Sequence, residues 1–453
     1  MRVAIVWAAA LSQALLADTL IRNVTLIDMA TGNESAHQSV LIHGDRIRAV
    51  GANLRAGPHV EVVNGVGKYL IPGLWDMHVH LWYKENQLPQ YVAWGITGVR
   101  DMGSDLAQVK RWRAEMQAGK FVGPHIETSG PPVDGGPSDD PKLPILVVQT
   151  PVEARNTYDD LEQKYNVDFV KVLSRLPRDA YFALLERARK WGLQVAGHVP
   201  ESVTVDEAID ARQDSIEHLT GVLLACSSDE RRIRKDRADA IAHKDREAGL
   251  AAAQRVLATF DEKKAQKLVE RMARFKVYEV PTLVMLRRTT LLNAEALVHD
   301  PHVKSIPASI RKTWDDPREQ LKETPAATLD LLKRQYEMDA ALVRRMQVSD
   351  VPIMAGTDTG DPYTFPGYDL HRELQLLVEA GLTPLEALRA ATLTPARFLN
   401  ADESLGSIAA GKMADLVILN ADPLKDIHNT EKISAVFAAG KYLSRARLDV
   451  LQK

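Results

Sequence analysis

Two histidines, His78 and His80, stand one residue apart in the apolar stretch LIPGLWDMHVHLW, residues 70–82. In a β-strand, residues i and i+2 point to the same face, so both imidazoles would point in one direction. Two neighbouring imidazoles can bind one metal cation, although two polar residues on a solvated face have the same spacing. The pair becomes a candidate metal site only if further ligands exist elsewhere in the chain.

Four further residues of ligand or acid–base type stand at the ends of apolar, strand-like segments. They are Lys171 in FVKVL, His198 in VAGHVP, His218 in SIEHLTG and Asp358 in MAGTDTG. Taken singly, a strand-end histidine can be structural, a lysine stem can pack in a core, and an aspartate can cap the next helix. Together with the histidine pair they form a set of nitrogen and oxygen ligands without thiolate. Such a set fits zinc, with manganese and cobalt as alternatives.

Lys171 is the informative member of this set, because an ammonium group cannot bind a cation. Burial among apolar neighbours disfavours the charged form of an amine. A neutral amine can add carbon dioxide and become an anionic carbamate, whose two oxygens can bridge two cations. We therefore predict two divalent metal ions that share this carbamate. The other ligands divide into one group for each ion: His78, His80 and Asp358, and His198 and His218.

Two adjacent cations have a defined chemistry. They lower the pKa of a bridging water so that hydroxide exists near neutral pH, and they polarise a carbonyl group. A carboxylate beside that hydroxide can take its proton and pass it to a leaving amine. The residue types therefore predict a hydrolase in which a metal-activated water attacks a carbonyl group.

The segments that carry these residues alternate with amphipathic helical stretches, which is typical of β/α repeats. Eight such repeats predict an α/β fold with a (β/α)₈ TIM-type barrel, whose functional residues lie at the carboxyl ends of its strands. Charge-rich helical segments, 227–276 and 286–347, are expected to cover one rim. The eight expected strands lie within residues 73–81, 95–102, 124–130, 167–173, 193–199, 215–221, 277–284 and 351–358.

Both ends of the chain are β-rich. We expect residues 18–69 and 403–453 to form one small composite β-sandwich domain, with residues 70–402 as the barrel. Residues 1–17 are mainly apolar after one arginine, which is typical of a signal peptide, with a buried first helix as the alternative. A periplasmic or secreted protein is therefore expected.

Composition excludes several classes of function. The net charge is −3 and no basic block occurs, which argues against nucleic acid as a partner. Cys226 is the single cysteine, so an intrachain disulfide and a zinc finger are both excluded, and we expect a buried thiol. No cysteine follows the N-terminal apolar run, so no membrane anchor is expected. The expected partner is a small-molecule substrate, and a homo-oligomer stays open.

Several of these stretches occur together in a known group of enzymes. PGLWDMHVH, FVKV, GHV, EHL, GTD and the tail GSIAAGKMADLVILNADP resemble the amidohydrolase superfamily, and more narrowly its imidazolonepropionase/prolidase-like branch with a carboxylated lysine. The resemblance covers residues 19–445 and includes the segment 371–400. It implies that hydroxide attacks a carbonyl or similar centre while the aspartate after the eighth strand moves the proton, and Asp358 matches that position.

The leading hypothesis is a periplasmic or secreted binuclear amidohydrolase that cleaves an amide bond in a dipeptide or N-acyl amino acid. A hydrolase of a cyclic amide, lactone, carbamate or phosphoester stays open. In a different class, the chain could be a non-catalytic binding protein of the same fold. A periplasmic solute-binding protein would explain the signal peptide but not the histidines.

Other residues are candidates for substrate contacts. Arg100 and His371 could bind a carboxylate or carbonyl, but Arg100 could equally form a salt bridge with Asp101 or another barrel residue. Tyr278 could line the pocket or simply pack. The histidines of HDPHV, His299 and His302, are expected at the surface.

Overall fold

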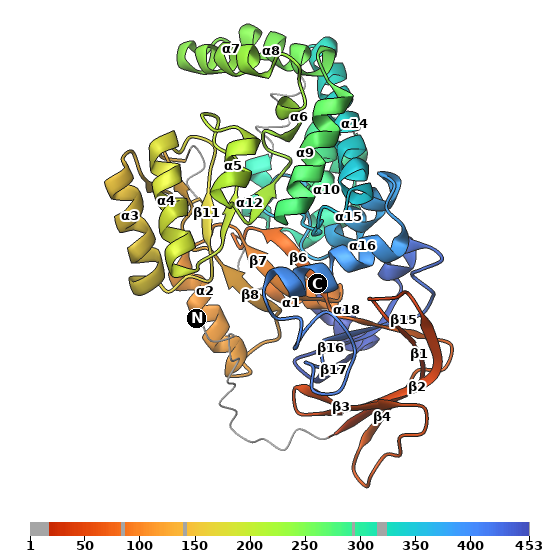
Figure 1. Ribbon diagram of the computed structural model, residues 1–453. Helices are drawn as coiled ribbons and strands as arrows, with labels where there is room; N and C mark the ends of the chain where they lie inside the picture. The colour runs from red at the N-terminus through yellow and green to blue at the C-terminus, as the bar shows by residue number, and fades with distance from the viewer. Residues whose placement is uncertain (1–17, 83–86, 139–142, 292–294, 315–323, 453) are drawn as a thin grey trace.

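The computed structural model describes residues 18–82, 87–138, 143–291, 295–314 and 324–452 of the chain. The segment that carries the expected signal peptide, 1–17, lies outside the described residues. Figure 1 shows strands from both ends of the chain gathered in one β-rich region, beside a larger region in which strands and helices alternate.

One eight-stranded sheet combines the two ends of the chain, in the order β17-β16-β15-β5-β1-β2-β3, with β4 paired to β1. Its strands are β1 (Thr19–Ile27), β2 (Glu34–His43), β3 (Arg46–Gly51), β4 (Glu61–Asn64), β5 (Tyr69–Pro72), β15 (Leu416–Leu419), β16 (Ile433–Ala438) and β17 (Lys441–Ser444). β1 pairs with β4 along its first half and with β5 along its second. The described strands from both ends of the chain are therefore hydrogen-bonded into one branched sheet.

The larger region is built from short parallel strands that are almost completely buried, as is usual where helices cover both faces of a sheet. One sheet has the order β6-β7-β8, and the other β10-β9-β11-β12-β13-β14. The strands are β6 (Leu74–Val79), β7 (Ile96–Asp101), β8 (His125–Thr128), β9 (Val133–Asp134), β10 (Leu146–Val147), β11 (Val170–Val172), β12 (Val195–Gly197), β13 (Ser215–Glu217) and β14 (Tyr278–Val280).

Backbone hydrogen bonds connect the edges of these two sheets. The amide of Met354 donates to Glu279 O at 2.9 Å, and the amide of Met77 donates to Ala355 O at 2.9 Å. Segment 351–358, expected as the eighth strand, thus lies between β14 and β6, although its only β-bridge among the described residues is the isolated one between Ile353 and Glu279. A further backbone hydrogen bond joins the end of β8 to the residues just before β11.

Helices follow the strands along the chain. The α4 sequence shows why: Ala180, Leu184 and Ala188 recur at helical spacing on its buried face, and Gly192 ends it in a left-handed conformation. The first group comprises α1 (Gln87–Ala93), α2 (Leu106–Gln117), α3 (Pro151–Asp159), α4 (Arg178–Trp191), α5 (Val205–Ala211) and α6 (Val222–Ala225). The last group comprises α15 (Tyr368–Glu379), α16 (Pro384–Ala390), α17 (Leu393–Phe398) and α18 (Arg445–Leu451).

The charge-rich segments are helical, and α7 and α8 extend away from the strands as a pair (Figure 1). Within the described ranges, we find no helix whose length and apolar content would let it cross a membrane. These segments contain α7 (Glu230–His243), α8 (Arg246–Ala258), α9 (Glu262–Phe275), α10 (Leu283–Leu291), α11 (Glu295–Val298), α12 (Ala308–Arg311) and α14 (Ala326–Val348).

Candidate metal centre

All six residues singled out as metal ligands lie at the carboxyl ends of the parallel strands. Because those ends meet at one edge of the strand array, side chains from distant parts of the sequence come together there. The residues and their positions are His78 on β6, His80 just after it, Lys171 on β11, His198 after β12, His218 after β13 and Asp358 at the end of segment 351–358.

Three of these residues form a compact group. Ligand atoms of His78, His218 and Asp358 all lie within 4.8 Å of one another. Asp358 Oδ1 is 3.3 Å from Nε2 of His78 and also 3.3 Å from Nε2 of His80, and Oδ2 is 3.6 Å from Nε2 of His218. Two ligand atoms, each about 2.1 Å from a tetrahedral ion, are about 3.4 Å apart. The observed spacings therefore fit ligands that share an ion.

Lys171 and His198 adjoin this group. Lys171 Nζ is 3.2 Å from His78 Nε2, and the rings of His198 and His218 have centroids 5.3 Å apart. Burial lowers the pKa of Lys171 to about 8, which brings the neutral amine within reach of ordinary pH. Burial also lowers the pKa of His218 to about 3, so this imidazole is neutral and able to bind a metal.

The outer nitrogen of each histidine is already engaged. Because a carbonyl or an ionised carboxylate can only accept, Nδ1 of His78 and of His80 carries the proton, and Nε2 presents a lone pair to the centre. The four Nδ1 contacts are His78 with Glu217 at 2.8 Å, His80 with Gly103 O at 2.9 Å, His198 with Ser174 Oγ at 2.7 Å and His218 with Thr282 Oγ1 at 2.7 Å.

The surroundings of Asp358 Oδ1 show whether the residues of this centre fit a bound cation. Asp358 Oδ1 is buried and has no hydrogen-bond partner among the described residues, while two Nε2 lone pairs face it at 3.3 Å. Lone pairs that converge without a donor between them repel one another, and a cation removes that repulsion. The donor set of imidazoles and carboxylate is the one that suits zinc and similar divalent ions. The residues therefore fit a divalent metal.

The backbone at the centre is strained. His218, Leu219 and Asp358 have φ angles of +59°, +55° and +56°, in the left-handed region that residues other than glycine seldom adopt. Thr282, which contacts His218, has φ +47° although its side chain is β-branched. Such strain persists only where surrounding packing fixes the conformation, and it is common at functional sites.

Two expected substrate contacts have structural roles instead. Arg100 is fully buried, and its guanidinium pairs with Glu217, not with the neighbouring Asp101. His371 is also fully buried, with its ring nitrogens 2.9 Å from Trp94 O and 3.0 Å from Thr430 Oγ1. Neither side chain is free to bind a substrate carboxylate.

Three other residues discussed from the sequence, Tyr278, Cys226 and His302, are also placed by the structure. Tyr278 packs edge-on against Phe398, with ring centroids 4.9 Å apart. Cys226 is buried as predicted, and burial raises the pKa of its thiol to about 12. His302, expected at the surface, is half-buried and stacks on Tyr368 with centroids 3.6 Å apart.

Sequence reasoning missed the outer contacts of the histidines. Glu217 stands inside an apolar strand and is fully buried, a placement that is costly for an unpaired carboxylate. The same argument had singled out Lys171, so it could have found Glu217. Ser174 and Thr282 carry no comparable indication, because small hydroxyl residues are common in loops.

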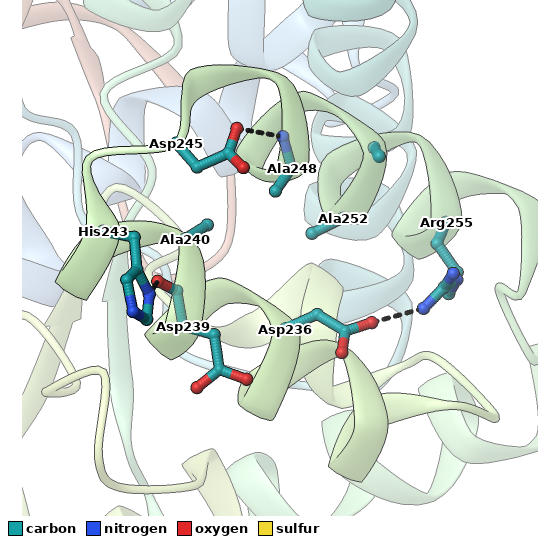
Figure 2. Close-up of a pocket in the computed structure, with 9 residues that line it drawn as sticks. Asp236, Asp239, Ala240, His243, Asp245, Ala248, Ala252 and Arg255 are labelled. Atoms are coloured by element: carbon teal, nitrogen blue, oxygen red, sulfur yellow. Dashed lines mark hydrogen bonds and ion pairs between the residues drawn. The ribbon is translucent and has the colours of Figure 1, made fainter.

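A separate hollow of about 300 Å³ lies between α7 and α8, and Figure 2 shows its acidic lining. Its charged groups are already partnered: Asp236 with Arg255 at 2.5 Å, and Asp239 with Lys235 at 2.8 Å. Asp245 accepts from the amide of Ala248 at 3.0 Å and so caps α8. The hollow therefore has no unpaired group that points to a ligand.

The chain is similar to a known protein family along most of its length. The model of the amidohydrolase family matches residues 69–443. An imidazolonepropionase from Streptococcus gordonii is 35% identical over 98 residues, which is 21% of this chain and 30% of that protein. The chain thus matches less than a third of the length of this relative.

Two solved structures share the fold. A Xaa-Pro dipeptidase with bound methionine in the active site has a TM-score of 0.68 at 21% identity, over 94% of this chain and 100% of that one. A bottromycin amidohydrolase has a TM-score of 0.76 at 21% identity, over 95% of this chain and 88% of that one.

Proposed function

The chain belongs to the amidohydrolase family, and on that basis we propose that it is a metal-dependent hydrolase of carbon–nitrogen bonds. The observation that carries the proposal is the convergence of imidazole Nε2 atoms on the unpartnered, buried oxygen of Asp358. The name of one structural neighbour, a Xaa-Pro dipeptidase, denotes cleavage of a peptide bond and supports the same chemistry.

The proposed cofactor is a pair of divalent ions, with zinc as the expected metal. His78, His80 and Asp358 would hold one ion, and His198 and His218 the other. Lys171 would join both as a carbamate, formed when its neutral amine bonds to carbon dioxide and releases one proton. The position of Lys171 supports this assignment: its Nζ lies at the centre, 3.2 Å from His78 Nε2, and burial lowers the pKa of the amine to about 8.

When bound, the ions would supply a water that is acidic near neutral pH and a Lewis acid for the scissile carbonyl. Asp358 would accept the proton of that water and deliver it to the leaving amine, so that one proton is moved and none is lost. His78 and His80 would keep Nε2 free of a proton, because their Nδ1 protons are held by acceptors outside the centre.

The proposed substrate is a dipeptide or an N-acyl amino acid, supported by the fold shared with a Xaa-Pro dipeptidase. A cyclic amide is the second candidate, favoured by the sequence similarity to imidazolonepropionase. The hydrolysis of lactones, carbamates and phosphoesters would use the same metal chemistry.

Three structural expectations belong to the same proposal. The parallel strands would close into a (β/α)₈ barrel across residues 70–402, supported by the backbone hydrogen bonds from segment 351–358 to β14 and β6. The sheet from residues 18–69 and 403–453 would be a separate domain. Export to the periplasm or medium would follow from removal of residues 1–17.

One screen tests the proposed function. Protein loaded with zinc would be incubated with dipeptides, N-acyl amino acids and cyclic amides, and released amines or ring-opened products would be measured. We expect hydrolysis that disappears when a chelator removes the metal and returns when zinc is restored. Full activity in metal-free protein, or no hydrolysis by protein shown to contain metal, would overturn the proposal.

A further inference from the structure

A buried ion pair lies directly behind the metal centre. Arg100 on β7 donates from Nη2 to Glu217 Oε1 on β13 at 2.7 Å, and neither side chain is exposed. The other oxygen of Glu217, Oε2, is 2.8 Å from Nδ1 of His78. A continuous path of hydrogen bonds therefore runs from a guanidinium that does not touch the centre to one of its ligands.

Each member of this path is held by further contacts. Arg100 also donates from Nε to Met77 O at 2.7 Å and from Nη1 to Ser215 Oγ at 3.1 Å. Ser215 Oγ in turn donates to Glu217 Oε1 at 2.6 Å. The guanidinium carbon lies 5.0 Å from the ring centre of Phe398. Glu217 consequently has both oxygens occupied and little freedom to turn.

Packing alone does not require charges at this place. A buried ion pair is often no more stabilising than apolar side chains of similar volume, because both groups lose their hydration. The interior of a parallel strand array is usually filled by branched apolar residues. What the pair provides beyond packing is a fixed anionic acceptor for the Nδ1 proton of His78.

We propose that Arg100 and Glu217 act as a positioning pair that orients His78 as a metal ligand. Arg100 fixes the carboxylate of Glu217, and Glu217 fixes the ring orientation and the tautomer of His78, so that Nε2 faces the centre. This inference rests on the proposed metal site. Neither residue touches substrate or metal, so both act through His78.

Two double variants separate positioning from packing. Arg100→Met with Glu217→Leu removes both charges and leaves Nδ1 of His78 without an acceptor. Arg100→Met with Glu217→Gln also removes both charges, but its amide oxygen can accept from His78 while its amide nitrogen donates to Ser215. The pair of variants therefore differs in the acceptor offered to His78.

The measurement is the affinity of each metal-free protein for Zn²⁺, by competition with a chromophoric chelator, with the visible spectrum of the Co²⁺ form as a second readout. We expect the Leu variant to bind Zn²⁺ about 10- to 100-fold more weakly than the Gln variant, since loss of an outer ligand contact has effects of that size. Equal affinities and equal Co²⁺ spectra would overturn the inference.

Two further variants keep the result interpretable. Glu217→Gln alone, checked for folding by circular dichroism, should also bind Zn²⁺ at least about tenfold more weakly, because its amide nitrogen must face either Arg100 or His78. Wild-type affinity in this variant would overturn the inference even if the Leu variant does not fold. Arg113→Met is the control, because Arg113 pairs with Asp168 before β11, and no hydrogen bond from either side chain to the six expected ligands is found among the described residues. It should lower the melting temperature without changing Zn²⁺ affinity, and a comparable loss would assign the effect to general destabilisation.

If wild-type protein itself binds neither Zn²⁺ nor Co²⁺, the proposed function fails and not merely the positioning role.

Discussion

The carboxylate of Asp76 accepts two hydrogen bonds from Thr357, one from its backbone amide at 3.0 Å and one from its hydroxyl at 2.6 Å. Asp76 stands two residues before His78, and Thr357 directly precedes Asp358. The amide of Asp358 also donates to His78 O at 2.8 Å. The first and last strand-like segments are thus joined beside the centre, and the distance between their ligands depends on this buried contact.

Thr357→Val tests that dependence, because valine has nearly the shape of threonine but no hydroxyl. The change leaves one oxygen of Asp76 without its donor, which typically costs about 1–3 kcal/mol. We expect a lower melting temperature and a fall in kcat larger than the change in KM, since Asp358 would lose its fixed position. Thr357→Ser keeps the hydroxyl and serves as the control. Equal kinetics in the two variants would show that the hydroxyl does not position Asp358.

Asp358→Asn tests proton transfer. Asparagine can still offer one oxygen to a metal, but it cannot accept the proton of an attacking water. We expect kcat to fall by about 10²- to 10⁴-fold, the usual contribution of a general base, while metal content stays near that of the wild type. Metal analysis and single-turnover kinetics measure the two quantities separately. An unchanged rate would remove Asp358 from the chemistry.

Lys171→Ala tests the carbamate. Without the bridging group we expect the purified protein to lose metal, mainly the second equivalent, and to regain part of it in acetate or propionate, which can occupy the space. Lys171→Arg is the matched control. It keeps a long cationic side chain but cannot form a carbamate, so it should lose metal as well. A normal metal content in both variants would contradict a bridging role for Lys171.

The ligands could be predicted from the sequence because their positions follow local rules. His78 and His80 face one way because a strand has a period of two, and polar residues that end parallel strands gather at one edge. The pairing of Glu217 with His78 was beyond such rules, although the burial of a carboxylate inside an apolar strand does single out Glu217 itself. It lies 139 residues from His78 in the chain, and only the arrangement of β6 and β13 brings the two together.

Segment 351–358 shows a second limit. Its apolar residues predicted a regular strand, but Pro352 has no amide hydrogen and Asp358 adopts φ +56°. Pairing is therefore restricted to the few residues between them, where a single isolated bridge, between Ile353 and Glu279, forms instead of a ladder. The hydrophobic pattern of the sequence identifies such a segment. Whether its backbone pairs regularly depends on how it lies between β14 and β6, which the pattern does not show.

The pH dependence of stability tests a buried acid that is not one of the expected ligands, Asp339 on α14. Burial raises the pKa of Asp339 from 3.8 to about 8, and no hydrogen bond or ion pair to its carboxyl is found among the described residues. The unfolded chain releases this proton near pH 4 and the folded chain only near pH 8. Between these values the unfolded state binds fewer protons, so this group lowers stability as pH rises, by about 1.4 kcal/mol per pH unit.

Asp339→Asn removes that contribution. We expect the variant to gain stability over the wild type progressively from about pH 4 to pH 8, with no further gain above pH 8, where the folded state also ionises. Chemical denaturation at a series of pH values measures the difference. Asp330→Asn on the exposed side of the same helix controls for loss of a charge from α14 and should give a flat profile. A stability difference for Asp339→Asn that does not change with pH would contradict the raised pKa and would mean that water solvates this carboxyl in the folded protein.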